Sequence, residues 1–449
     1  MKSVALHNLG CKVNSYELDV MRQKLHENGY SIVSFDEVAD IYIVNTCSVT
    51  NIADRKSRQM LHQAKKRNPQ AVVVAVGCYA QTGTQQAKED EAVDLIIGNN
   101  KKKDIVEILE QYFLDHPDKT LHDTTVIDIN KTNQYEEMTL KTTTEHTRAY
   151  IKIQDGCNQF CSYCIIPYAR GRVRSRQEKD ILAEVENLVS SGFREIVVTG
   201  IHISSYGMDF DRKKNPVGTA AFDYHRLLSL LQKLNRLEGL SRIRLGSLEP
   251  RIITREFVQE LVKLEKLCPH FHLSLQSGCD ETLHRMNRHY TTGEYLEKVK
   301  ILRECFPDPA ITTDVITGFP GETDEEFEKT KDFLDRVHFY EMHIFPYSKR
   351  KGTVAADRKD QVPDRIKKER SSILLEMERK QSAEYRRKWI GKTEEVLLEE
   401  QKRIGEEMYQ IGHTKNYVRV AVKTDENLSG QLHTGLITGF LQEDLMRME

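Results

Sequence analysis

The sequence has no apolar stretch long enough for a membrane-spanning helix. No run approaches the roughly 18 consecutive apolar residues that such a helix needs, and the N-terminus carries no apolar core of a signal peptide. Glycine and proline are also scarce, with 24 and 11 among 449 residues, which excludes a collagen-like or low-complexity chain. We therefore expect a soluble, cytoplasmic, globular protein with no membrane partner.

Neither sign of charge is in excess. Lysine and arginine number 66 against 68 aspartates and glutamates, so the formal net charge is −2. A nucleic acid would have to bind a local basic patch, because the overall field is weak. The GxxxxGK[ST] phosphate loop, the GxSxG nucleophile elbow and the HExxH zinc helix are also missing. The chain therefore shows no sign of a P-loop enzyme, a serine hydrolase or an HExxH metalloprotease.

The first part of the chain alternates short apolar runs with amphipathic helical segments. This alternation predicts a parallel sheet with right-handed helical crossovers. At roughly 150 residues per domain the length predicts about three domains, and we assign residues 1–128 to the first. The polar stretch 131–145 has little apolar periodicity and is interpreted as a linker. The predicted strands are 3–9, 40–46, 71–77 and 94–99, and the predicted helices are 16–29 and 53–69.

The second part, assigned to residues 146–375, repeats the alternation on a longer scale. Six strand–helix units without a second sheet predict a partial (β/α)6 barrel, with an open sheet as the alternative. Such folds carry their chemistry on loops at the carboxyl ends of the strands. The predicted strands are 149–155, 195–200, 241–247, 271–277, 311–318 and 341–348, and the predicted helices are 179–192, 293–306 and 323–337.

The last part begins with one charged helix, 363–390, which has Pro363 at its start. After Gly391 the hydrophobic period changes toward two, and turn residues separate short strands. This pattern predicts a small β-barrel, which we assign to residues 376–449. The fold class is therefore α/β: a parallel α/β sheet domain, a partial barrel and a small terminal β-barrel.

A knot of three cysteines is the strongest chemical signal. Cys157, Cys161 and Cys164 follow a predicted strand with C-x3-C-x2-C spacing. Nine cysteines is an odd number, which argues against a fully paired disulfide framework. Three thiolates can wrap one face of an iron–sulfur cube and leave its fourth iron without a protein ligand, whereas a closed structural zinc site needs a fourth ligand. The alternative is a structural zinc knuckle completed by His146 or His202.

A second set of three cysteines is widely spaced. Cys11, Cys47 and Cys78 each lie just after a predicted parallel strand, at the sheet edge where α/β proteins gather ligand-binding loops. Three thiolates at one edge could hold a second cluster, and the alternative is three inert buried cysteines. The remaining cysteines, Cys268, Cys279 and Cys305, show no metal-ligand spacing.

The knot, with Tyr163 just before its last cysteine, resembles the signature of the radical S-adenosylmethionine (SAM) superfamily. The resemblance implies that SAM binds the free iron and is cleaved by one electron to a 5′-deoxyadenosyl radical. The protein then supplies cluster ligation, orientation of SAM and exclusion of water. Ordinary turn chemistry is the alternative at any single loop. The residues that the resemblance assigns to SAM binding are Tyr163, Gly200, Gln276, Asp314 and Gly318.

The motifs LGCKVN, NTCSVT and GCYAQ, followed by the knot and a terminal β module, resemble the methylthiotransferases. That family has an N-terminal cluster domain, a radical-SAM barrel and a TRAM RNA-binding domain. The first two motifs are most similar to the branch that converts N6-threonylcarbamoyladenosine at position 37 of tRNA to its 2-methylthio form. The resemblance implies two 4Fe–4S clusters, SAM, an electron donor, a sulfur source and the anticodon stem-loop of tRNA as partners.

Two alternatives to this function stay open. One is the same chemistry on isopentenyladenosine in tRNA or on a ribosomal-protein aspartate. The other, of a different class, is a non-catalytic RNA-binding protein that is stabilised by zinc.

Basic residues just after the knot suggest contacts with RNA. Arg170, Arg172, Arg174 and Arg176 occupy alternate positions and, if extended, would point the same way, toward phosphates. In the terminal module, aromatic residues such as Tyr417 alternate with cations, a pattern that suits unstacked bases. The alternatives are a solvated surface strip and a module used only for packing. We predict that RNA is bound by Arg170, Arg172, Arg174 and Tyr417.

Overall fold

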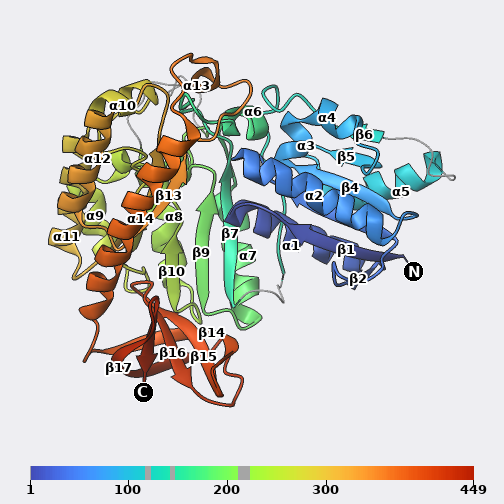
Figure 1. The fold of residues 1–449 in the computed structure, drawn as a ribbon. Coiled ribbons are helices and arrows are strands. Elements are labelled where there is room, and N and C mark those ends of the chain that lie inside the picture. Colours follow the sequence, from blue (N-terminus) through green and yellow to red (C-terminus); the bar gives the residue numbers. More distant parts are fainter. Residues whose placement is uncertain (1, 117–122, 142–146, 211–222) are drawn as a thin grey trace.

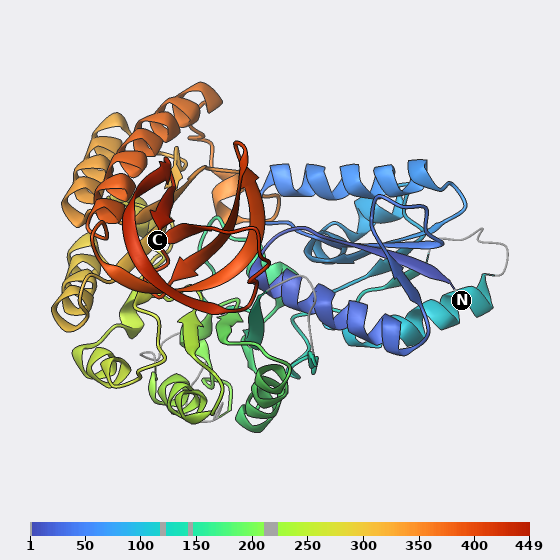
Figure 2. The same cartoon turned by 90° about the horizontal axis from the view of Figure 1, so that it is seen from below.

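The computed structural model describes residues 2–116, 123–141, 147–210 and 223–449. His146 and part of the predicted linker, 142–145, lie outside the described residues. Figures 1 and 2 show three parts: an N-terminal sheet with helices on both faces, a larger curved array of strands and helices beside it, and a small barrel at the C-terminus. Among the residues described, no helix combines the length and the apolar character needed to cross a bilayer.

The N-terminal sheet has six parallel strands in the order β2-β1-β3-β4-β5-β6. The four predicted strands are confirmed, and the short strands β2 and β6 were not predicted. Every residue of β3 and β4 is buried, as expected of a parallel sheet covered on both faces. The strands are β1 Ser3–Asn8, β2 Ser31–Val33, β3 Ile41–Thr46, β4 Val72–Gly77, β5 Leu95–Ile97 and β6 Asp123–Thr125. The helices are α1 Lys12–Glu27, α2 Asn51–Arg67, α3 Cys78–Thr82, α4 Thr84–Lys88 and α5 Ile105–Asp115, with a 3-10 turn at Lys102–Asp104.

The central part is the predicted partial barrel, and all six predicted strands are present. β7, β9 and β10 form one parallel sheet, with the short β8 antiparallel to β7, and β11 to β13 form a second. A parallel bridge between Leu248 and Leu273 joins the two sheets. The strands are β7 Arg148–Asp155, β8 Arg174–Ser175, β9 Glu195–Gly200, β10 Arg242–Leu245, β11 His270–His272, β12 Ala310–Thr317 and β13 Glu341–Pro346.

Helices cover the outer side of this strand array (Figure 2). α11 and α12 each begin with a capping box, in which a threonine and the glutamate three residues later satisfy each other's backbone N–H groups. One apolar core joins the outer side of the barrel strands to one face of the N-terminal sheet. The helices are α6 Ile166–Arg170, α7 Glu178–Ser190, α8 His225–Arg236, α9 Arg255–Val262, α10 Asp280–Arg285, α11 Thr292–Cys305, α12 Asp324–Val337 and α13 Val354–Asp357, with 3-10 turns at Ile203–Ser205 and Pro250–Ile252.

The C-terminal part confirms the predicted helix and small β-barrel. α14, Asp364–Arg387, begins directly after Pro363 and packs along β13. The barrel is closed, with the strand order β14-β15-β16-β18-β17. The predicted limit between residues 375 and 376 falls inside α14, and the three domain limits stay predictions. The strands are β14 Thr393–Ile404, β15 Glu407–Thr414, β16 Arg419–Lys423, β17 Leu432–Gln442 and β18 Leu445–Met448.

Buried charges join the N-terminal domain to the barrel. Glu17 of α1 accepts hydrogen bonds from Lys152 of β7 at 2.6 Å and from Arg170 of α6 at 2.8 Å, and it also pairs with Lys102. Although burial raises the pKa of Glu17, these three cations outweigh it and hold that pKa well below its usual range. Asp155 at the end of β7 pairs with Lys152 at 2.7 Å. The network therefore fixes α1 and the first barrel strand against each other.

Replacing Glu17 with Gln should destabilise this junction strongly. The substitution leaves several buried cations with Asp155 as their main counter-charge, and breaking a buried pair typically costs about 3–5 kcal/mol. Glu27→Gln on the same helix is the matched control, because Glu27 pairs with Lys141 in an exposed ion pair worth at most about 1 kcal/mol. Thermal denaturation of the two variants measures the difference, and equal midpoints would contradict the assigned role of Glu17.

Candidate active site

The first cysteine triad lies in the loop between β7 and α6. The backbone N–H of Cys157 donates to the carbonyl of Gly171 at 3.0 Å, and that of Cys164 donates to the carbonyl of Cys161 at 2.9 Å. Gly156, just before the triad, has φ of +72°, and a Cβ there would clash with the carbonyl of Arg172. A glycine is therefore required where the chain leaves the strand, and the loop folds back over α6.

The surroundings of these thiols suit a metal cluster. Burial, followed by the neighbouring Cys161, raises the pKa of Cys157 to about 12, and burial also raises the pKa of Cys164. Thiols of this kind stay protonated at neutral pH unless a metal ion displaces the proton. Arg288 places its Nη1 at 3.4 Å from Cys161 Sγ, so a cation lies beside the sulfur that becomes anionic. Three soft donors in a sheltered loop fit an iron–sulfur cluster.

A small pocket lies beside this loop. Its volume is about 170 Å3, and its lining includes Tyr163, Gln276 and Asp314 from the barrel and Val49 and Thr50 from the N-terminal domain. The structure thus brings together three of the five residues predicted to bind SAM. Gln276 has φ of +75°, a strained conformation of the kind that is concentrated at functional sites.

The other two predicted SAM residues are not in the lining of this pocket. Gly200 ends β9, where a Cβ would lie 3.0 Å from the carbonyl oxygen of Gln154. Gly318 follows β12 with φ of +67° and packs under Lys367 of α14, where a Cβ would clash. Both glycines are explained by close backbone or side-chain approach, and their contact with SAM stays a prediction.

Two histidines that the sequence prediction missed line the barrel interior next to the pocket. His272 Nε2 lies 3.2 Å from Asp314 Oδ2, and its ring stacks on His343 at 5.7 Å. Burial raises the pKa of Asp314, but the hydrogen bond and charge of His272 outweigh burial and leave that pKa below its usual value. The available signal was the period of two, because Asp314 pairs with His343 and His272 pairs with Thr312, two residues before Asp314 and therefore on the same face.

The second cysteine triad converges as predicted at the carboxyl edge of the N-terminal sheet. Cys11 precedes α1, Cys47 follows β3 and Cys78 begins α3. A Cβ on Gly10 would lie 3.0 Å from Cys47 Sγ, so the loop that carries Cys11 passes directly over Cys47. Burial, and then the neighbouring Cys78, raises the pKa of Cys47 to about 12. The three thiols are therefore close enough to interact, and their role as ligands stays a prediction.

The two triads belong to one region of the molecule. Asn99 Nδ2 lies 3.7 Å from Cys78 Sγ and also donates to the carbonyl of Ala169 in α6 at 2.8 Å. Val49 and Thr50, which line the pocket beside Tyr163, follow Cys47 in the same loop. The pocket is thus bordered by the loops that carry the two sets of cysteines.

Comparisons with known proteins agree with this geometry. Residues 151–334 match the family described as Radical SAM superfamily, and residues 3–98 match Uncharacterized protein family UPF0004. The chain is 39% identical over 433 residues to the threonylcarbamoyladenosine tRNA methylthiotransferase MtaB of Bacillus subtilis, covering 96% of this chain and 93% of that protein. The chain belongs to the radical SAM methylthiotransferase family. Membership brings a 4Fe–4S cluster and SAM as cofactors of the barrel.

Further relatives of this methylthiotransferase fall in two groups by name. The MtaB protein of Aquifex aeolicus is 42% identical, covering 90% of this chain and 95% of that one. A tRNA-2-methylthio-N(6)-dimethylallyladenosine synthase of Thermoanaerobacter sp. is 36% identical, covering 96% and 89%. Among solved structures, the radical SAM methyltransferase TsrM of Kitasatospora setae superposes with a TM-score of 0.53 at 15% identity, covering 79% of this chain and 77% of that one. This last likeness concerns the fold alone.

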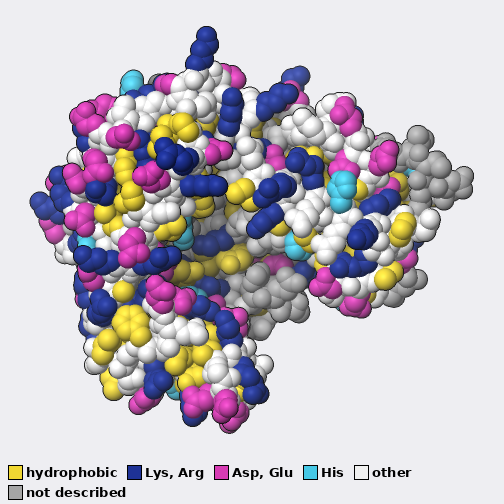
Figure 3. Space-filling view, in the orientation of Figure 1, with side chains coloured by type: hydrophobic (Ala, Val, Ile, Leu, Met, Phe, Trp, Pro, Cys, Tyr) yellow, Lys and Arg dark blue, Asp and Glu magenta, His cyan; other side chains and the backbone are white. Residues whose placement is uncertain are grey.

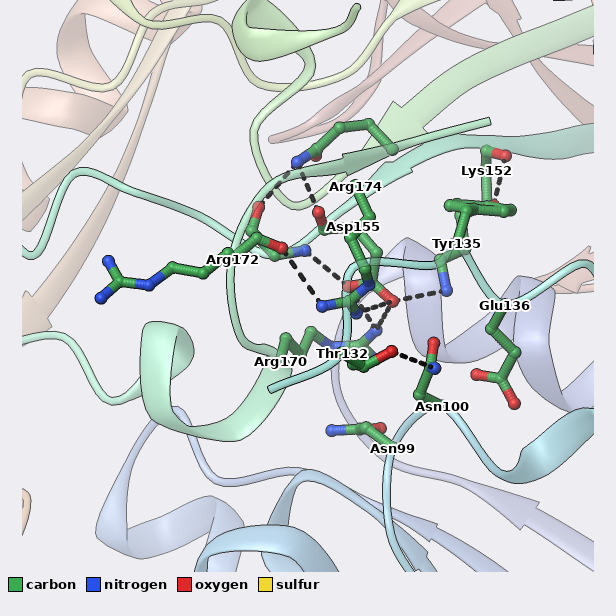
Figure 4. A network of polar contacts seen from close by, with 12 residues as sticks. Asn99, Asn100, Thr132, Tyr135, Glu136, Lys152, Asp155, Arg170, Arg172 and Arg174 are labelled. Carbon is green, nitrogen blue, oxygen red and sulfur yellow. Dashed lines mark hydrogen bonds and ion pairs between the residues drawn. The ribbon is translucent and has the colours of Figure 1, made fainter. Parts of the chain in front are cut away.

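Two of the arginines predicted to bind RNA point into the methylthiotransferase instead (Figure 4). Arg170 and Arg174 are fully buried and pair with Asp155, at 3.2 and 3.7 Å. The expectation of RNA contact is corrected at both positions, because burial removes their guanidinium groups from the reach of a phosphate. Arg170 ends α6 and Gly171 has φ of +71°, so the segment is not one extended strand. Arg172 points the other way, partly exposed, with its guanidinium 4.4 Å from the ring of Phe160.

Tyr417 is corrected as well. Its ring is stacked between His270 of the barrel at 4.4 Å and His413 of the small barrel at 4.7 Å. With both faces covered, the ring is not free to stack on a base, and it instead seals the small barrel against β11. The alternative zinc ligand His202 has its Nδ1 2.7 Å from the hydroxyl of Ser205.

Proposed function

We propose that the protein transfers a methylthio group to C2 of N6-threonylcarbamoyladenosine at position 37 of tRNA. Relatives that carry this activity in their names are 36–42% identical over most of the chain, which supports the choice of substrate. The structural observation that carries the proposal is the pocket lined by both cysteine-bearing domains. Methylthiolation needs a C–H-activating centre and a sulfur source at the same carbon, and this arrangement meets that need.

Two 4Fe–4S clusters and SAM are the cofactors of this proposal. Cys157, Cys161 and Cys164 would hold the cluster whose remaining iron binds SAM. Cys11, Cys47 and Cys78 would hold the second cluster. When bound, these groups would supply the radical that removes the C2 hydrogen, the sulfur that replaces it and, from a second SAM, the methyl group on that sulfur. An electron donor and a sulfur source complete the set of partners.

The chain's own residues orient the reactants and exclude water. Gln276 and Asp314 present an amide and a carboxylate to the pocket, where both can hydrogen-bond to a polar cofactor. Tyr163 packs on Phe319 at 6.4 Å and forms an apolar wall. Val49 and Thr50 border the pocket from the N-terminal domain. The buried ion pairs of Glu17 keep the two domains at a constant separation, which a reaction between two centres requires.

The RNA would approach through a wider cleft at the same junction. This cleft has a volume of about 830 Å3, and its lining includes Arg58 of α2, Tyr168 of α6 and the segment 349–351. Arg350 Nη2 lies 2.6 Å from Asp54 Oδ2 and ties the loop after β13 to α2. Arg58, Lys349 and Lys351 supply positive charge for phosphates, and Figure 3 shows basic side chains gathered between the barrel and the N-terminal domain.

Anaerobic reconstitution with iron and sulfide tests this function. We expect about eight irons per chain and, with SAM and a reductant, 2-methylthio product on an anticodon stem-loop that carries threonylcarbamoyladenosine. Mass spectrometry of the nucleosides measures the product. A stem-loop carrying isopentenyladenosine and a ribosomal-protein peptide are the matched substrates. Product formed only from one of these two substrates would contradict the proposed substrate. Bound zinc without SAM cleavage would favour the non-catalytic RNA-binding protein.

A further inference from the structure

One lysine beside the barrel strands forms no ion pair among the residues that the structure describes. Lys12 is the first residue of α1, directly after Cys11, and its side chain is exposed. Among the residues that the structure describes, its ammonium group has neither an ion-pair partner nor a hydrogen-bond partner. It lies close enough to Arg148 of β7 and Arg244 of β10 for their charges to act on it, and more strongly than the carboxylate of Glu195 does. Figure 3 shows the molecule hollowed where the three parts meet, with basic side chains inside the hollow.

The arginines around Lys12 are already neutralised. Arg148 lies 3.1 Å from Glu399 of the small barrel, and Arg244 lies 2.8 Å from Glu195 of β9. Arg242 lies 3.7 Å from Glu195 as well, so two arginines share this carboxylate. Lys12 therefore adds a positive charge that these two carboxylates do not balance. An anionic ligand would be attracted to this end of the interior.

A buried polar atom next to Lys12 also lacks a partner. His270 is 5% exposed and stacks on Tyr417, and its Nδ1 has no hydrogen-bond partner among the described residues. The charges of Lys12 and Arg244 both act on this ring. An Nδ1–H can donate to an anion, so His270 offers a hydrogen bond at the place where Lys12 offers a charge.

The next inward position along β11 from His270 is His272, which contacts a carboxylate of β12. Asp314 lines the pocket next to Gln276, and His272 and His343 lie beside it with ligand atoms within 4.8 Å. Both nitrogens of His272 have hydrogen-bond partners, Thr312 at 3.0 Å and Asp314 at 3.2 Å, so these side chains form a hydrogen-bonded wall rather than a metal site. A substrate whose tail ends in a carboxylate would be repelled by Asp314 and attracted to Lys12. An anionic substrate tail would therefore be oriented with its charge toward Lys12 and away from Asp314.

We propose that Lys12, with His270 beside it, binds the free carboxylate of the threonylcarbamoyl group and thereby selects this nucleoside over one with an uncharged N6 substituent. The inference rests on the proposed function. In the threonylcarbamoyl group the threonine nitrogen is bonded to the carbamoyl carbon, so the carboxylate remains free and is ionised at neutral pH. An isopentenyl group has no charge and leaves Lys12 without a partner, which is the kind of mismatch that gives strong discrimination.

Binding of three anticodon stem-loops to the reconstituted protein, without reductant, tests the inference. Position 37 carries threonylcarbamoyladenosine, its carboxamide analogue or unmodified adenosine. We expect the wild type to bind the carboxylate RNA about tenfold more tightly than the carboxamide RNA, as for a hydrogen bond to a charged group. Lys12→Gln should remove this difference without changing the affinity for the unmodified RNA. Lys12→Arg should retain the difference in affinity, because the charge is kept. Lys300→Gln removes the charge of an exposed lysine on α11 and is the matched control, which should also retain the difference.

Two results would overturn the inference. One is equal affinity of the wild type for the carboxylate and carboxamide RNAs, which needs no variant and holds even if Lys12→Gln loses iron through its position next to Cys11. The other is undiminished discrimination by a Lys12→Gln protein with wild-type iron content. Failure of the proposed function gives a different result: the wild type, supplied with SAM and reductant, then forms no 2-methylthio product on the carboxylate RNA.

Discussion

Replacing Cys157, Cys161 or Cys164 with Ala should abolish formation of 5′-deoxyadenosine from SAM. The three thiols lie in one short loop, and two remaining thiolates would not hold an open iron–sulfur cube in place. Chromatography of the reaction products after anaerobic reconstitution and reduction measures SAM cleavage. We expect the loss to be complete, because without the cluster no electron reaches SAM.

The control for this experiment is Cys305→Ala. Cys305 ends α11 on the outer layer of the barrel, and it is partly buried, like the three knot cysteines. This variant should cleave SAM at the wild-type rate, so a general effect of removing a cysteine is separated from loss of the ligand. Normal 5′-deoxyadenosine production by Cys157→Ala would show that the barrel cysteines do not hold the cluster that cleaves SAM.

The triple replacement of Cys11, Cys47 and Cys78 with Ala should separate SAM cleavage from methylthiolation. The variant should still form 5′-deoxyadenosine, because the barrel loop is in a different domain and its cysteines are unchanged. It should form no methylthio product, since the sulfur that replaces the C2 hydrogen would have no site next to the base. The iron content should fall from about eight to about four per chain.

Iron analysis and nucleoside mass spectrometry on the same preparation measure both effects. Cys268→Ala is the control, because Cys268 is fully buried in the barrel and shows no ligand spacing. Persistent methylthiolated RNA, or unchanged iron in the triple variant, would show that the three N-terminal cysteines are core residues. Loss of SAM cleavage together with methylthiolation would show that the two sites depend on each other.

Much of the fold followed from local patterns in the sequence. Apolar runs marked four strands of the first sheet and all six parallel strands of the barrel, because a strand that is buried on both faces needs a continuous apolar stretch. The convergence of Cys11, Cys47 and Cys78 was also predictable, since the carboxyl ends of parallel strands meet at one edge. The short strands β2, β6, β8 and β18 were not predicted.

The direction of individual charged side chains did not follow from the sequence. Alternate spacing suggested that Arg170, Arg172 and Arg174 share one exposed face, but the first and last are buried and only Arg172 points outward. For Arg170 the reason lies far away in the chain, in Glu17 of α1, which accepts hydrogen bonds from Arg170 inside the protein. A pattern of spacing cannot register a partner more than 150 residues away.

The sequence by itself determined that Cys157, Cys161 and Cys164 lie together, because three thiols within eight residues must lie close together in any fold that keeps their loop. It also determined the order of the α/β sheet, the barrel and the small terminal barrel, because strands alternate with helices in the first two and the hydrophobic period changes toward two in the last. Only the tertiary structure decided which residues share the barrel interior. Lys12, His270 and Asp314 come from three separate elements, and their meeting depends on packing between domains rather than on neighbours in the chain.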